Sequence, residues 1–255
     1  MVQPKLPVIT QVNHRGGRHY EAEGYGDKRF VSVTTVLKII NKPALIPWAR
    51  NTALESMKTQ LTNTMRHKRK LTPEALDVML VNAKRRPDAS RDAAADTGTM
   101  AHSIIEQCVR MGEFEVPEDI QHIIDNFDAW AFFSGITVDH TEVSLINPKV
   151  PYGGMVDAIG RRLDNNKRVI LDWKTSKGLF DETALQLAAY ARAWEALTGE
   201  HVHEAYAVRL GKFKGETIDF EMARVRDLKR SWRAFKAAFH LHESFKTGGR
   251  HLEDV

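Results

Sequence analysis

The segment Arg168–Gly178, RVILDWKTSKG, places an aspartate and a lysine in an otherwise apolar β-strand pattern. Asp172 and Lys174 are separated by one tryptophan, so in a strand both side chains point to the same face. Burying a carboxylate or an ammonium group is costly unless each is paired or bound to something. The pattern therefore favours a site in which these two charges pair with each other or bind a ligand.

A second carboxylate is expected beside them. The segment MVDAIGRRLD precedes the strand, and Asn165–Asn166 between the two is typical of a two-residue hairpin turn, because asparagine tolerates positive φ. This turn predicts a register in which Asp157 faces Lys174 and Ile159 faces Asp172. Facing residues share one face of a sheet, with Cβ atoms roughly 4.5–5.5 Å apart. Two carboxylates and one lysine are therefore predicted on one face of a hairpin.

The two predicted carboxylates need a partner. At this separation they repel each other and raise one another's pKa. A divalent metal ion would resolve the conflict, because hard cations prefer carboxylate oxygens. Lys174 beside them could then hold a water molecule or a developing oxyanion. The alternative is an Asp–Lys–Asp ion-pair cluster on an exposed sheet face, but the apolar residues that flank Asp172 indicate a buried strand.

Short motifs elsewhere in the chain extend this pattern. They are SVTTVL at 32–37, GTMAH at 98–102, EV at 142–143, GGMVD at 153–157, DWK at 172–174 and Q-x-x-x-Y at 186–190. In this order, and on these strand and helix types, they resemble the PD-(D/E)XK nuclease superfamily and its RecB-like exonuclease branch. Within that branch the chain is most similar to the mitochondrial genome maintenance exonucleases and their bacterial and phage relatives. A lone D-x-K motif would carry little weight, whereas the ordered set is specific.

The resemblance implies roles for the residues of the hairpin. Asp157 and Asp172 would bind the metal, with the backbone carbonyl of Trp173 as a further oxygen ligand. Lys174 would be the catalytic lysine, which orients the attacking water and stabilises charge on the pentavalent phosphorane. The implied cofactor is one or two Mg²⁺ or Mn²⁺ ions.

Residues outside the hairpin also match the family pattern. His102 matches a metal-binding histidine ahead of the sheet, and Glu142 matches an acidic position that acts as an outer ligand or an orienting group. Gln186 and Tyr190 match a helix motif that supports the site and touches the nucleic-acid backbone; being four residues apart, they share one helix face. Glu106 lies four residues after His102 and is predicted to hold the imidazole or to act as a backup ligand. A histidine nitrogen among oxygens predicts that Mn²⁺ supports at least as much activity as Mg²⁺.

Two departures from the family pattern narrow the resemblance. The superfamily's proline is absent, since Met155 and Val156 precede Asp157, and this branch commonly lacks it. Cys108 is the only cysteine, which excludes a disulfide within the chain, cysteine-bound zinc and the iron–sulfur cluster of other relatives. The helicase phosphate loop G-x-x-x-x-G-K-[ST] is also missing from the sequence.

The expected fold is a single α/β domain with a restriction-endonuclease-like core, in which helices flank a mixed central sheet. Its predicted parts are an N-terminal hairpin and helix (1–49), a basic helical insertion (50–96), the catalytic core (97–245) and a loose tail (246–255). The expected elements are hairpin strands at 19–23 and 29–33, a helix capped by Thr34 or Thr35, helices at 53–65, 72–85 and 100–111, a helix within PEDIQHIIDNFDAWAFFSG, a strand at 136–146, the hairpin around 165–166, a helix at 182–197 capped by Asp181 and stopped by Gly199, strands at 205–210 and 216–223, and a helix at 225–245.

Positive charge gathers in the predicted insertion. Residues 50–91 contain ten Lys or Arg and four acids, with clusters RHKRK at 66–70 and KRR at 84–86. One interpretation is the solvated surface of ordinary helices, and the other is a wall that attracts phosphates. Under the second interpretation Arg85 and Arg86 would help to grip single-stranded DNA and exclude duplex, as in the relatives that the chain resembles.

Three aromatic residues are candidates for stacking on bases, namely Trp48, Tyr152 and Trp173. For Trp48 and Trp173, packing in the core is the simpler interpretation. Cys108 follows an apolar helix pattern, which indicates a packing role and no redox function.

The bulk composition is that of an ordinary globular protein. Of 255 residues, 27% are charged and 42% hydrophobic, and the net charge of +4 is a mild preference for polyanionic partners. No apolar run of about 18 residues predicts a membrane span. The first residues lack the features of a signal or transit peptide, so a cytoplasmic location, in a bacterial or phage-infected cell, is expected.

These features predict a metal-dependent DNA exonuclease that hydrolyses phosphodiester bonds, preferably in single-stranded DNA with a free end. Three alternatives stay open: a structure-specific endonuclease on the same fold, a non-catalytic DNA-binding module, and a structural ion-pair cluster without a nucleic-acid role. The combination of Asp157, Asp172, Lys174 and His102 argues against a mere binder, because a phosphate-binding surface has no use for carboxylates. Recombination, DNA repair, the removal of leftover DNA after replication and phage genome processing all fit such an enzyme.

Overall fold

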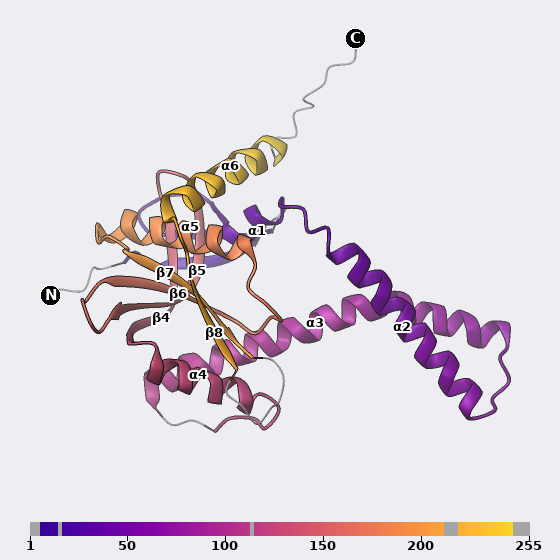
Figure 1. Ribbon diagram of the computed structural model, residues 1–255. Helices are drawn as coiled ribbons and strands as arrows, with labels where there is room; N and C mark the ends of the chain where they lie inside the picture. The colour runs from indigo at the N-terminus through magenta and orange to yellow at the C-terminus, as the bar shows by residue number, and fades with distance from the viewer. Residues whose placement is uncertain (1–5, 15–16, 113–114, 212–218, 247–255) are drawn as a thin grey trace, which may run out of the picture. The chain divides into compact units, whose positions relative to one another are not determined.

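The computed structural model describes residues 6–14, 17–112, 115–211 and 219–246 and has a mixed α/β fold (Figure 1). It divides into two compact units. One, the sheet unit, comprises Met1–Ile40 and Ala101–Val255, and the other, the helical unit, comprises Asn41–Met100. The predicted class, a mixed central sheet flanked by helices, is confirmed.

Within its described residues, the sheet unit is built on eight strands. Their order is β1-β2-β3-β5-β6-β7-β8, with β4 paired to β5 beside this path. The β3–β5 and β6–β7 pairs are parallel and the others are antiparallel. The strands are β1 (Ile9–His14), β2 (Gly17–Ala22), β3 (Phe30–Ser32), β4 (Ile136–Asn147), β5 (Tyr152–Arg162), β6 (Arg168–Lys174), β7 (Glu204–Leu210) and β8 (Phe220–Arg224).

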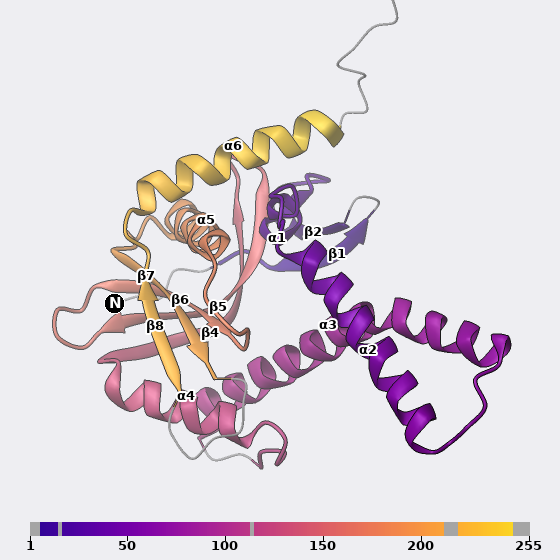
Figure 2. The same cartoon turned by 45° about the vertical axis from the view of Figure 1, so that its right-hand side comes forward.

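Helices cover both faces of the sheet because its central strands carry apolar residues on both sides. Alternate residues of β6 belong to different cores: Ile170 packs with α5 and α6, whereas Leu171 and Trp173 pack with α4 and the end of α3. Figure 2 shows α6 lying outside α5 on one side and α4 on the other. These helices are α1 (Val33–Leu37), α4 (Gln121–Phe133), α5 (Asp181–Thr198) and α6 (Leu228–Lys246).

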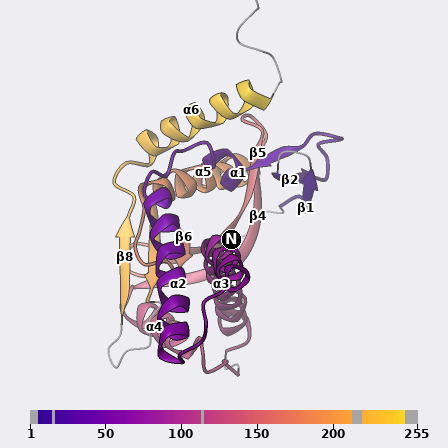
Figure 3. The same cartoon turned by 90° about the vertical axis from the view of Figure 1, so that its right-hand side faces the viewer.

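The helical unit is a helical hairpin formed by α2 (Leu45–Arg66) and the first part of α3 (Pro73–Met111) (Figure 3). The amide of Gln60 donates to the carbonyl of Met79 and accepts from the side chain of Asn82, which joins the two helices. None of the helices described combines the length and the apolarity that crossing a bilayer requires.

The prediction of separate helices at 72–85 and 100–111 is wrong, because α3 is continuous. Pro87 lies inside the helix, where it removes one backbone hydrogen bond without ending the helix. Near Gly98 the hydroxyls of Thr97 and Thr99 donate to the carbonyls one turn earlier, at Ala93 and Ala95. These hydroxyls therefore point back onto their own helix and do not break it.

Smaller differences concern element ends. Strand β1 was not predicted. Helix α1 has Ser32 as its N-cap, where Thr34 or Thr35 was predicted. Helix α5 has Phe180 as its N-cap, where Asp181 was predicted. Gly199 ends α5 in a left-handed conformation as predicted. The strand expected at 216–223 begins at Phe220, its first residues lying outside the described part, as does the predicted tail from residue 247.

The predicted register of the β5–β6 hairpin is wrong by two residues. Ile159 pairs with Ile170 and Arg161 with Arg168. Arg162 N donates to the carbonyl of Lys167, so the turn holds four residues, and only Asn166 has positive φ. A shift of two residues keeps every side chain on its face. Continued, the register sets Asp157 across from Asp172 and not from Lys174.

Candidate active site

The candidate site lies where the sheet opens. Strand β5 pairs with β3 at Tyr152 and Gly153, and with β6 only from Ala158 onward, so residues 154–157 pair with neither. In that gap Asp157 Oδ2 accepts a hydrogen bond of 2.7 Å from the backbone N–H of Trp173. The carboxylate of Asp157 thus accepts a hydrogen bond from a backbone amide that has no partner in the β5–β6 ladder.

Three metal-ligating side chains converge beside this gap. Donor atoms of His102, Glu142 and Asp157 all lie within 4.8 Å of one another. His102 Nδ1 lies 3.5 Å from Asp157 Oδ1 and 3.9 Å from Glu142 Oε1, and its Nε2 lies 3.2 Å from the carbonyl oxygen of Trp173. The imidazole comes from α3, two residues beyond the helical unit, and the carboxylates come from neighbouring strands.

Glu142 reaches this cluster through an unusual backbone conformation. It sits within β4 between Thr141, which pairs with Ala158, and Val143, which pairs with Val156. Its φ is 51°, in the left-handed region that residues other than glycine seldom adopt. Such a residue costs about 1–3 kcal/mol and is usually found where the surrounding structure enforces it, often at functional sites. Here it places a third acid beside Asp157 and His102.

A second group of polar side chains holds Asp172. Its carboxylate is fully buried; Oδ2 lies 2.5 Å from Lys174 Nζ, and Oδ1 accepts a bond of 3.0 Å from Gln186 Nε2. Gln186 also donates to the hydroxyl of Tyr190 at 3.1 Å. Both of these residues come from one face of α5. Asp172, Lys174 and Gln186 therefore form one connected group next to Asp157.

A glycine makes room for this arrangement. A Cβ built on Gly154 would lie 2.4 Å from Cε1 of Tyr190, far inside van der Waals contact. The sequence motif GGMVD contains Gly154, but no role was predicted for it. A glycine inside a strand is the signal that could have found it, because it often marks the close approach of another group.

The site is electrostatically crowded. Burial lowers the pKa of His102, but the carboxylates of Asp157, Asp172 and Glu142 outweigh it and raise the pKa to about 9. Burial, reinforced by Asp157, raises the pKa of Glu142 to about 7. Burial also raises the pKa of Asp172 to about 6, against the opposing effect of Lys174. Too many acids share this space for all of them to be ionised without a compensating cation.

The donor set fits a divalent metal ion. Two carboxylates and one imidazole are within reach of a common point, and a backbone carbonyl, that of Trp173, lies beside the imidazole. Buried Asp172 Oδ2 has the Lys174 ammonium group near it but no hydrogen bond of good geometry. Among the residues that the structure describes, this group of three contains Glu142 and not Asp172, whose role as a metal ligand stays a prediction.

Some predicted site residues lie elsewhere. Glu106 forms an ion pair of 3.0 Å with Arg110 and does not hold His102. Tyr190 is only 2% exposed, so its predicted contact with a nucleic-acid backbone is wrong and it supports Gln186 from within. Tyr152 and Trp173 are also buried, which excludes them as stacking platforms. Trp173 packs edge to face on Phe127 and Trp130 in the core, while Tyr152 donates a hydrogen bond to the carbonyl of Ala189.

The helical unit holds the remaining predicted residues in one groove of about 810 Å³. Trp48, 41% exposed, lines it together with Arg85 and Arg86. The rest of the lining is polar or small: Asn51, Thr52, Glu55, Ser56, Thr59, Gln60, Asn82, Ala89 and Ser90. The core interpretation of Trp48 is therefore wrong, and this aromatic ring is available to a ligand.

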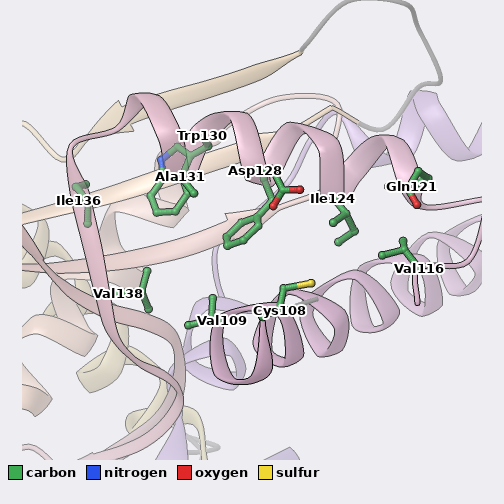
Figure 4. A pocket seen from close by; sticks show the side chains of 12 residues that line it. Cys108, Val109, Val116, Gln121, Ile124, Asp128, Trp130, Ala131, Ile136 and Val138 are labelled. Atoms are coloured by element: carbon green, nitrogen blue, oxygen red, sulfur yellow. The ribbon is translucent and has the colours of Figure 1, made fainter. Parts of the chain in front are cut away.

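A separate cavity of about 760 Å³ lies between α4 and the last turns of α3 (Figure 4). Its lining is mainly apolar, with Val109, Ile124 and Trp130 beside the thiol of Cys108. Burial raises the pKa of this thiol, so it is not activated as a nucleophile. The structure gives Cys108 a packing role.

Comparison with known proteins adds little to this geometry. No protein-family model and no curated protein matches the chain. Among solved structures, one named SSO0001 is 20% identical, with a TM-score of 0.27; the match covers 49% of this chain and 61% of that one, less than two thirds of its length. An alkaline exonuclease from Laribacter hongkongensis (LHK-Exo) is 14% identical, with a TM-score of 0.31 and coverage of 61% and 85%. Likenesses this weak say nothing about activity.

Proposed function

We propose that the chain is a metal-dependent nuclease that hydrolyses phosphodiester bonds in DNA. The observation that carries the proposal is the meeting of the His102–Glu142–Asp157 donor group with the buried Asp172–Lys174 pair at the opening of the sheet. An ion pair alone would need neither the imidazole nor the left-handed Glu142. A phosphate-binding module would gain nothing from three carboxylates.

The residues would divide the chemistry among them. A bound Mg²⁺ or Mn²⁺ would supply Lewis acidity and a water of lowered pKa. The ion would be held by His102, Glu142 and Asp157. Asp172 and the backbone carbonyl of Trp173 would lie beside these ligands. Asp157 is fixed by the Trp173 amide, and Asp172 by Gln186.

Lys174 would act on the phosphate itself. Its ammonium is held 2.5 Å from Asp172, and although burial lowers its pKa, Asp172 and Asp157 raise it further, so the group stays charged. A compact positive charge there would orient the water and stabilise the charge that develops on the phosphate oxygens.

We further propose single-stranded DNA with a free end as the substrate. The groove of the helical unit, with Trp48 beside Arg85 and Arg86, supports this, because an unpaired base can stack on an aromatic ring while guanidinium groups hold phosphates. A structure-specific endonuclease on the same fold is the second candidate. Such an endonuclease would cut circular single-stranded DNA, whereas an exonuclease that needs a free end would not.

The test is degradation of single-stranded DNA labelled at either end, alongside circular single strands, with Mg²⁺ or Mn²⁺. Wild type should release a ladder from a free end, and the labelled end gives the polarity. Lys174→Ala should lower turnover by about 10²–10³-fold. Lys177→Ala, three residues further along the same segment, is the matched control and should retain activity. Excess chelator should abolish cleavage, and Mn²⁺ should support at least as much activity as Mg²⁺.

Three outcomes would change the proposal. Cleavage of circles would make the enzyme an endonuclease. If neither wild type nor Lys174→Ala cleaves any substrate with any metal, the site is only an ion pair on a strand. Activity with Mg²⁺ but none with Mn²⁺ would count against His102 as a ligand.

A further inference from the structure

A second basic surface lies on the sheet unit itself. Residues 224–236, RVRDLKRSWRAFK, contain six Lys or Arg and a single acid. Helix α6 buries Phe235 and Phe239 against α5 and turns its cations outward, with Lys229, Arg230 and Arg233 exposed. The sequence pattern predicted only the helix here, because a run of cations on a helix is usually an ordinary solvated face.

The basic face borders a groove of about 720 Å³. One side is the first turns of α5, from Phe180 to Leu187, and the other carries Arg224, Arg226 and Arg230. The floor is apolar, formed by short side chains of β7 and β8. The groove thus has three arginines on one wall, the aromatic ring of Phe180 on the other, and two carboxylates, Asp181 and Asp227, in its lining.

The arginines that line the groove form few salt bridges within the described part of the chain. Arg224 approaches Glu204 at 3.6 Å on the surface. Arg226 and Arg230 form no salt bridge with any residue that the structure describes. The one nearby acid of this stretch, Asp227, caps the helix by accepting the backbone N–H of Arg230 at 2.9 Å. Arg226 and Arg230 therefore line the groove without a salt bridge to a described carboxylate, although Asp227 lies near Arg230.

The groove begins close along the chain to the catalytic strand. Lys174 ends β6, and residues 175–180 lead directly to Phe180, which is 58% exposed and lines the groove. An exposed phenylalanine offers a face to an unpaired base, which a base inside a duplex could not use. Phe235 and Phe239 of α6 are buried in the core, and the exposed apolar side chains of this helix, Leu241 and Phe245, lie near its C-terminal end and not beside Arg230.

We propose that this groove binds single-stranded nucleic acid outside the catalytic group, with phosphates at Arg226 and Arg230 and a base on Phe180. The inference rests on the proposed nuclease function and deepens it, since it gives a long strand a second grip on the same unit that cleaves it. It predicts that affinity grows with strand length beyond what the catalytic group alone can contact.

The test is equilibrium binding of labelled oligothymidines of about 4 and about 16 nucleotides, lengths that bracket common single-strand sites. The full chain is used in excess chelator, so that no turnover occurs. Arg226→Glu with Arg230→Glu should weaken binding of the longer strand about tenfold and reduce the slope of log K against log salt by about 0.7 for each phosphate that is no longer neutralised. The shorter strand should bind with nearly unchanged affinity.

Matched controls separate this groove from general effects. Lys149→Glu with Lys167→Glu makes the same charge change at exposed positions elsewhere and should leave binding unchanged. Phe180→Ala should weaken binding of the longer oligonucleotide about fivefold or more. Phe132→Ala removes an even more exposed phenylalanine from α4 and should have no effect.

The outcomes distinguish this proposal from the nuclease itself. If wild type cleaves DNA but both arginine reversals leave affinity and salt slope unchanged, the groove is not a binding site. If the reversals weaken binding while wild type cleaves nothing, the groove stands and the nuclease fails. If they abolish binding to phosphatidylserine vesicles and not to the oligonucleotide, the surface serves a membrane and the proposal is overturned.

Discussion

The two units of this protein are packed in opposite ways. In the sheet unit, β6 is buried on both faces, and the residues around Ile170 and Trp173 are closed off from solvent. In the helical unit, all of whose residues are described, Ala83 is the only buried side chain, and Leu54, Val78 and Leu80 are largely exposed. One unit is a close-packed core, and the other is a pair of helices with a single buried side chain, between which Gln60 forms hydrogen bonds to Met79 and Asn82.

This difference matches what each unit is proposed to do. Metal ligands must be held within fractions of an ångström, and only close packing on several sides restricts side chains that tightly. A surface that grips a flexible strand gains from accessible aromatic rings and cations, which a packed core would cover. Segments with little burial also open more easily.

The largest expected contrast is in stability. Ile170→Ala should lower the free energy of unfolding by about 2–5 kcal/mol, because it leaves a cavity between the sheet and α5. Leu54→Ala makes a similar truncation on α2, where the residue is 60% exposed. This change should alter the free energy of unfolding by less than about 0.5 kcal/mol. Urea denaturation followed by circular dichroism measures both. Equal losses in the two variants would mean that the helical unit shares a hydrophobic core.

An intermediate effect is expected at Gly154. Gly154→Ala would force a methyl group against Tyr190 and should destabilise the fold by about 1–3 kcal/mol. Because Tyr190 contacts Gln186, which holds Asp172, turnover should fall as well. Gly178→Ala is the control, since a Cβ there meets open space. Unfolding midpoints and cleavage rates of the two variants should therefore diverge; an unaltered rate in Gly154→Ala would show that Tyr190 does not position the site.

The smallest expected effect is on binding by the helical unit. Arg85→Glu with Arg86→Glu should weaken single-stranded DNA binding about tenfold and flatten its salt dependence. The unfolding midpoint should not move, because both side chains lie on the surface of α3. Fluorescence anisotropy across a salt series measures the effect, with Lys149→Glu and Lys167→Glu as the control. An unchanged salt slope would make these arginines ordinary surface residues.

Sequence patterns identified the parts of the structure that depend on local periodicity. The strand that carries Asp172 and Lys174 and the helix that carries Gln186 followed from alternation and helical spacing. The hairpin register was predicted two residues out, yet its face assignments are right because an even shift preserves them. Separate helices at 72–85 and 100–111 were predicted, and α3 instead continues through both Pro87 and Gly98.

Other features depend on contacts that no local pattern contains. The approach of Glu142 to His102 requires a left-handed residue inside a strand, where extended backbone is the natural expectation. The groove between α5 and α6 joins Phe180 to Arg230, which are fifty residues apart in the sequence. Only tertiary packing brings such residues together.

Position 142 sets folding against chemistry. Glycine would adopt the left-handed backbone there without strain, so a chain selected for stability alone would favour it. Glycine would also remove one of the three side chains that meet at the proposed metal. If the cluster acts as proposed, this protein keeps a carboxylate where its backbone prefers none, and its most stable sequence is not its most active one.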